Sequence, residues 1–163
     1  MDLNALLRLA HAVAGVTFVA GLIGFWIVRG MASRADSLAT MQLLLRTAVP
    51  FARMLSISGI TLTLFGLATA VSTGRPIFGP LQGGRVDWMF ASTLLMLPIF
   101  AFLTVIYPRF GRRLRTALAG AEPEGRVTPE IVAAWADPSY RFARRYDLVA
   151  ALVVLILMLA KPF

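Results

Sequence analysis

The chain has 163 residues, of which 58% are hydrophobic, and its mean hydropathy is +0.77. This length leaves room for one domain. The absence of cysteine excludes disulfides, thiol nucleophiles, iron–sulfur clusters and thiolate zinc sites. A net charge of +8 would suggest nucleic acid as the partner of a soluble domain. Here the basic residues flank apolar runs, so we expect contact with the lipid bilayer and its anionic lipid headgroups, and no nucleic acid.

Four apolar runs divide the chain, at Leu9–Val28, Leu55–Val71, Trp88–Tyr107 and Leu148–Ala160. A helix needs about 20 apolar residues to cross a bilayer core about 30 Å thick. The first and third runs reach that length, the second is slightly short, and the fourth is clearly short. We predict an all-α fold, an integral membrane four-helix bundle of up-and-down topology that forms a single transmembrane domain, 1–163. The predicted spans are at about 5–28, 54–72, 88–107 and 144–161.

Most of the 16 basic residues lie in two of the three connections. The first connection holds Arg29, Arg34, Arg46 and Arg53, and the third holds Arg109, Arg112, Arg113, Arg115, Arg126, Arg141, Arg144 and Arg145. Cytoplasmic connections of membrane proteins carry an excess of Lys and Arg. We therefore predict that these connections, including the loop 108–143, face the cytoplasm. Both termini and the loop 73–87 then face the outer (periplasmic) side of a bacterial inner (plasma) membrane.

Small residues recur at steps of three and four in the first two spans. They are Ala10, Ala14, Thr17, Gly21 and Gly24 in the first span and Ser56, Gly59, Thr63, Gly66 and Ala70 in the second. In lipid, small residues let two helix backbones approach each other. We therefore expect the first two spans to pack closely, although the same stripes are compatible with a homo-oligomer.

Proline and capping residues predict the remaining helix boundaries. Residues 37–49 have helical spacing, and Pro50 is expected to kink the chain or to begin the second helix. Pro98 should kink the third span. In the third connection, Thr128 and Pro129 open a short helix that ends near Ala136. Asp137 and Pro138 then open the last helix.

His11 is the only histidine, and it lies one to two turns inside the first span. Ionisable groups inside a membrane segment are costly and are often functional. A neutral imidazole is a common axial ligand of haem iron, so His11 is the candidate metal ligand. Arg8, three residues earlier, shares roughly the same face and is positioned to pair with a haem propionate. The alternative is a histidine near the membrane surface that bonds to a neighbouring hydroxyl or to a lipid headgroup.

Other residues that can carry chemistry give weaker signals. Met89 and Met96 are seven residues apart on the third span, and a thioether can bind Cu(I), but methionine also fills gaps in apolar packing. No carboxylate lies at the centre of a predicted span, which argues against a proton-coupled transporter. His11 has no Gly-flanked serine motif to accompany it, so Ser/His/Asp catalysis is not supported.

Several short motifs resemble a bacterial family of predicted four-span inner-membrane proteins with no assigned function. They are the segment from Leu6 to Gly15, the segment from Gly21 to Phe25, the Arg pair before the last span, and Lys161-Pro162-Phe163. More distantly, the chain is similar to the copper-resistance CopD family and to the haem-containing protoporphyrinogen oxidase family HemJ. In the HemJ family a basic residue precedes the haem-ligating histidine by three positions, and Arg8 and His11 match this pattern. That family also has a lysine shortly after a tryptophan early in the third span, where this chain has Trp88 and then Ser92.

These observations leave three functional hypotheses open. The first is a haem-binding redox or accessory protein, with haem b held by His11 and Arg8. The second is a non-catalytic structural or accessory subunit of a larger membrane complex, with no cofactor of its own. The third is a copper-handling protein of the CopD type. Whether the chain is an enzyme, and on what substrate, is left open by the sequence.

Overall fold

The computed structural model describes residues 2–160, and every element in that range is helical. The longer helices are α1 (Leu3–Ala32), α2 (Leu38–Ser72), α3 (Trp88–Ala101), α4 (Tyr107–Ala121), α5 (Pro129–Trp135) and α6 (Pro138–Ala160). Short turns of helix lie at η1 (Gly79–Gln82), η2 (Phe102–Ile106) and η3 (Glu122–Glu124). The all-α prediction is confirmed. Lys161, Pro162 and Phe163, which include the outer end of the fourth predicted span, lie outside the described residues.

Three helical stretches are long and apolar enough to cross a membrane. They are Leu3–Ala32, Leu38–Ser72 and Trp88–Glu124. Their outward faces carry large apolar side chains; Ile57 and Val71 are 67% and 72% exposed. A contiguous apolar surface of this kind suits hydrocarbon rather than water. These three stretches correspond to the first three predicted spans, as expected for a membrane protein.

The second helix continues through Pro50, so Pro50 lies inside α2 and does not begin the second helix. Ser37 caps α2, because its hydroxyl accepts a hydrogen bond from the backbone N–H of Thr40 at 3.2 Å. Proline lacks a backbone N–H, but a helix in lipid tolerates it where neighbouring groups form a hydrogen bond with the carbonyl that loses its partner. The predicted cytoplasmic helix 37–49 and the predicted span 54–72 are therefore one helix of 35 residues.

The third helix continues past its predicted span through a π-helical turn. Pro98 lies inside α3, and the π-helical turn η2 joins α3 to α4, which begins with Tyr107 and Pro108. Two prolines ten positions apart remove two backbone donors from one helix, and a local change of helix type is a usual response to such a loss. The predicted irregularity after Pro98 thus takes the form of a π-helical turn. The segment 108–143 is mostly helix, in α4, α5 and the start of α6.

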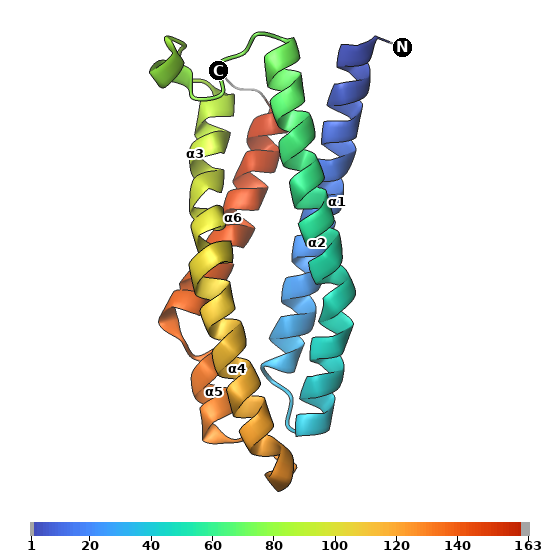
Figure 1. Ribbon diagram of the computed structural model, residues 1–163, viewed down its shortest axis with the longest axis vertical. Coiled ribbons are helices and arrows are strands. Elements are labelled where there is room, and N and C mark those ends of the chain that lie inside the picture. Colours follow the sequence, from blue (N-terminus) through green and yellow to red (C-terminus); the bar gives the residue numbers. More distant parts are fainter. Residues whose placement is uncertain (1, 161–163) are drawn as a thin grey trace.

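Helices α1 and α2 form the closest pair in the fold, side by side along much of their length (Figure 1). A Cβ atom added at Gly24 would lie 2.5 Å from the ring of Phe51, and one at Gly21 would lie 3.2 Å from the backbone nitrogen of Leu55. A larger residue at either position would force Phe51 or the α2 backbone to shift. The expectation that the small-residue stripes pack the first two spans together is confirmed at these glycines.

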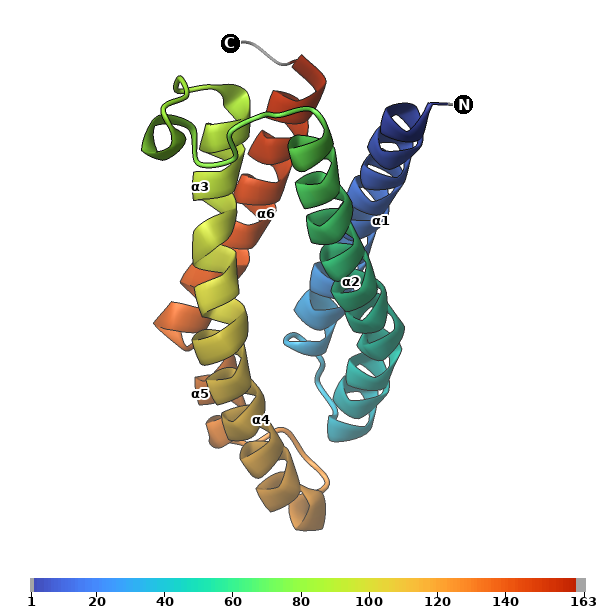
Figure 2. The ribbon, with the colours of Figure 1, turned by 45° about the horizontal axis from the view of Figure 1, so that its top comes forward.

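Helix α6 runs beside α3, and its last residues lie at the same end of the molecule as the start of α1 and the 73–87 connection (Figures 1 and 2). The opposite end holds the α1–α2 link and the helices α4 and α5. Most of the fully buried aromatic and aliphatic side chains gather toward this second end. They include Trp26, Met41, Phe110, Leu114, Ile131 and Tyr140. We call it the basic end, because the two Arg-rich connections meet there.

Candidate functional site

His11 lies in the interface between α1 and α2. Its Nδ1 atom is 3.0 Å from the backbone carbonyl oxygen of Leu62, so Nδ1 carries the proton and donates. The imidazole covers Gly66, where an added Cβ atom would come within 2.8 Å of the ring carbon Cε1. The ring therefore occupies the space left by the absent side chain of Gly66, and its hydrogen bond joins the two helices.

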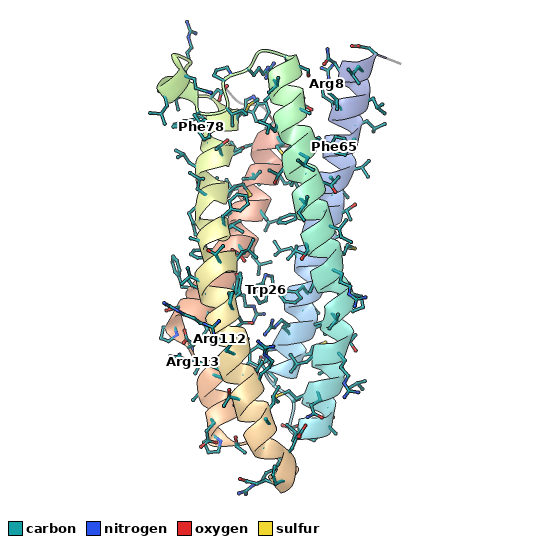
Figure 3. All side chains as sticks on the ribbon, in the orientation of Figure 1. Arg8, Trp26, Phe65, Phe78, Arg112 and Arg113 are labelled. Carbon is teal, nitrogen blue, oxygen red and sulfur yellow. The ribbon has the colours of Figure 1, made fainter. Side chains whose placement is uncertain are left out.

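This arrangement meets one requirement of a haem ligand. A donating Nδ1 leaves the Nε2 lone pair available for a metal, which is the usual tautomer of a ligating histidine. His11 is not among the residues that line the small apolar cavity beside Leu62 and Gly15, whose volume is about 30 Å³. Arg8 is exposed near the start of α1 (Figure 3), and its Nε donates to the backbone carbonyl of Asn4 at 3.1 Å.

The methionines are the candidate ligands for copper, and two of them line the same cavity. Met96 from α3 and Met158 from α6 both line the small apolar cavity, so the fold does bring two thioethers together. Met89 is not among the residues that line it. Ser92, the residue at the position of the lysine of the HemJ family, donates its hydroxyl to the carbonyl of Trp88 at 2.7 Å. Serine and threonine hydroxyls in helices commonly bond backward in this way.

The densest group of polar and aromatic side chains lies instead at the basic end, around Arg29. Its guanidinium carbon lies 4.9–5.7 Å from four ring centroids, those of Phe25, Phe110, Trp135 and Tyr140. Tyr140 stacks on Phe110 with centroids 3.7 Å apart and an interplanar angle of 8°. A cation over an aromatic face gains roughly 0.5–2 kcal/mol, so four rings offset part of the cost of removing Arg29 from water. We call this group the Arg29 cage.

Two further polar pairs adjoin the Arg29 cage. Arg144 lies over the Trp26 ring at 5.4 Å and donates from Nη2 to the backbone carbonyl of Trp26 at 3.2 Å. Figure 3 places Trp26 toward the middle of the molecule, between α1 and the α4–α6 side. The hydroxyl of Tyr107 donates to Oδ2 of Asp147, and Asp147 is a buried residue, only 4% exposed. These contacts tie α6 to α1 and to α4.

The buried polar atoms without a hydrogen-bond partner, within the residues that the structure describes, all belong to this region. They are Nε1 of Trp26, Nε of Arg29, Nε1 of Trp135, the hydroxyl of Tyr140 and Oδ1 of Asp147. Four of the five can donate. Buried polar groups in folded proteins are usually paired, so a concentration of unpaired donors at one place suggests a site.

The sequence predicted site residues in the first span and missed those at the basic end. Arg29 and Arg144 were assigned to the cytoplasmic connections as orientation signals. No spacing rule links Arg29 to Trp135 or Tyr140, which lie more than 100 positions away. No family model, curated protein or solved structure matches the chain, and the resemblance to the families named above stays a prediction.

Proposed function

We propose that this chain is a four-span protein of the bacterial inner membrane and that it acts as a non-catalytic accessory subunit. The observation that carries the proposal is the position of His11. Its imidazole holds α1 against α2 through Leu62 and Gly66, which is a structural role that needs no cofactor. In this proposal His11 serves to pack the two helices together. The haem and copper hypotheses are the alternatives against which the proposal is tested.

Helix α6 supplies the fourth span in this proposal. It is 23 residues long, which corresponds to about 35 Å at 1.5 Å per residue. Its first half carries Arg141, Arg144 and Asp147, which lowers its average hydropathy. Its second half exposes large apolar side chains, among them Leu159 at 77%. Long basic side chains at a helix end reach the membrane surface while their stems stay in lipid. Such a helix spans a bilayer when its charged end lies at the interface.

The orientation follows from the charge distribution along the molecule. The start of α1 and the described end of α6 lie at the same end of the molecule, opposite the two Arg-rich connections (Figures 1 and 2). The positive-inside bias then places the basic end in the cytoplasm and both termini on the outer side. Fusion of alkaline phosphatase at Phe163 should give an active reporter, and a fusion at Gly125, in the α4–α5 link, should be inactive. The reverse pattern, or activity at both sites, would exclude this topology.

The role of His11 is tested by the visible spectrum and the metal content of the purified protein. We expect a preparation that carries substoichiometric haem and copper and that keeps its helix content and monodispersity. The matched variant is His11→Ala. A Soret band at full occupancy that is lost in His11→Ala would replace the accessory proposal with the haem hypothesis. Stoichiometric copper that depends on Met96 and Met158 would replace it with the copper hypothesis.

A further inference from the structure

A cavity of about 510 Å³ lies at the basic end, between the end of α1, helix α5 and the first turns of α6. Its polar lining consists of Ser33, Trp135, Tyr140, Arg141, Arg144 and Arg145. Three guanidinium groups thus line one cavity. Its volume falls within the range of small-ligand sites, about 300–1,000 Å³. It is far larger than the apolar cavity beside Leu62.

No carboxylate lines this cavity to balance its charge. The ion pairs found within residues 2–160 are Arg113 with Asp137 at 2.6 Å and Arg126 with Glu124 at 2.8 Å. Asp137, the acid nearest in sequence to Arg141, is thus paired with Arg113, and it also caps α6 by accepting from the backbone N–H of Tyr140 at 3.1 Å. The lining of the cavity therefore carries positive charge without a matching acid.

The wall of the cavity also contains buried hydrogen-bond donors that lack an acceptor. Trp135 is 9% exposed and Tyr140 is 1% exposed, and the indole Nε1 of the first and the hydroxyl of the second have no partner. The same two rings form part of the Arg29 cage, so the positive charge of Arg29 lies behind this wall. Positive charge therefore lies both on the lining of the cavity and behind its wall.

We propose that this cavity binds a phosphate group, with Arg141, Arg144 and Arg145 as its cationic contacts. A phosphate offers several acceptor oxygens, and the planar guanidinium group binds such oxygens in pairs. The cavity has room for a phosphate and a small organic group attached to it. It lies where α6 enters the proposed membrane span. The phosphate therefore comes either from an anionic lipid headgroup or from a soluble phosphate ester.

The test compares two double variants that remove the same charge. Arg141→Gln with Arg145→Gln removes two exposed guanidinium groups from the cavity, so the helix core is left intact. Arg112→Gln with Arg115→Gln removes two exposed guanidinium groups from α4, outside the cavity. Thermal unfolding is measured in nanodiscs of phosphatidylcholine alone while glycerol 3-phosphate is titrated. It is then measured in nanodiscs that also contain phosphatidylglycerol, because a bound ligand raises the melting temperature of the state that binds it.

We expect one of the two probes to stabilise the natural chain and the α4 variant. The cavity variant should need a concentration of that probe about tenfold higher or more, because each lost contact is a charge-assisted hydrogen bond. A response to glycerol 3-phosphate identifies a soluble ester as the source, and a response only to phosphatidylglycerol identifies a lipid headgroup. If neither probe raises the melting temperature, or if both double variants lose the response equally, the proposed site is wrong. These results are independent of whether His11 binds haem, so they test this site separately from the accessory role.

Discussion

The packing role of His11 is tested most directly by filling the space beneath its ring. Gly66→Ala places a Cβ atom 2.8 Å from Cε1 and 3.1 Å from Nδ1 of His11. Carbon atoms in good contact are about 3.5–4.0 Å apart, so the imidazole must move away or the two helices must separate. Either movement weakens the hydrogen bond from Nδ1 to the carbonyl of Leu62. The substitution therefore acts on the contact of the His11 ring with α2, which a packing role requires and a metal-ligand role does not.

The expected cost is the sum of two opposing effects. Alanine is favoured over glycine inside a helix by roughly 0.5–1 kcal/mol, which stabilises any such variant. Overpacking at a tight contact costs roughly 1–3 kcal/mol. Gly111→Ala in α4 isolates the first effect, because a Cβ atom there has no neighbour within 4 Å. We expect Gly66→Ala to be less stable than Gly111→Ala by about 1–3 kcal/mol, with the helix-propensity effect cancelling in the comparison.

Thermal unfolding in detergent, followed by circular dichroism, measures this difference. For a chain of this size 1 kcal/mol corresponds to about 2–4 °C in melting temperature. The double variant His11→Ala with Gly66→Ala completes the cycle: removal of the ring should relieve most of the penalty of Gly66→Ala. If Gly66→Ala is as stable as Gly111→Ala, or if the penalty persists without the His11 ring, the imidazole does not fill this gap and the packing argument fails.

Two further predictions concern contacts that hold α6 in place, each measured by the same unfolding assay. Tyr107→Phe removes the hydrogen-bond donor to Asp147, whose other carboxylate oxygen already lacks a partner. We expect the free energy of unfolding to fall by about 1–3 kcal/mol. A fall below about 0.5 kcal/mol, roughly the lower bound for one hydrogen bond, would show that the pair adds little. Asp137→Ala should cost more than Arg113→Ala, because the first removes the cap on the Tyr140 N–H, worth about 0.5–2 kcal/mol, whereas the second removes only an exposed ion pair worth about 0–1 kcal/mol. Equal costs would mean that the cap contributes nothing.

Composition and local pattern were sufficient for the helices and for most of their ends. Apolar runs predicted the three long helices that can cross a membrane, because hydrophobic length is a local property of the chain. Thr128, Pro129, Asp137 and Pro138 predicted where α5 and α6 begin, because capping needs only adjacent residues. The glycine stripes predicted the pairing of α1 with α2, because small residues permit close approach whatever the partner. Pro50 does not begin the second helix, which starts at Leu38.

The basic end shows what local pattern does not contain. The Arg29 cage combines one cation from α1 with aromatic rings from α1, α4, α5 and α6. The cavity of about 510 Å³ draws its lining from the C-cap of α1 and from α5 and α6. An arginine beside an apolar run has the same sequence signature whether it orients the chain in a membrane or lines a cavity. The difference depends on which distant rings and donors the folded chain places around it, and that placement follows from helix packing in three dimensions. His11 is the same case: its neighbours in sequence suggest a ligand, and Gly66 and Leu62, 55 and 51 residues away, show a packing contact.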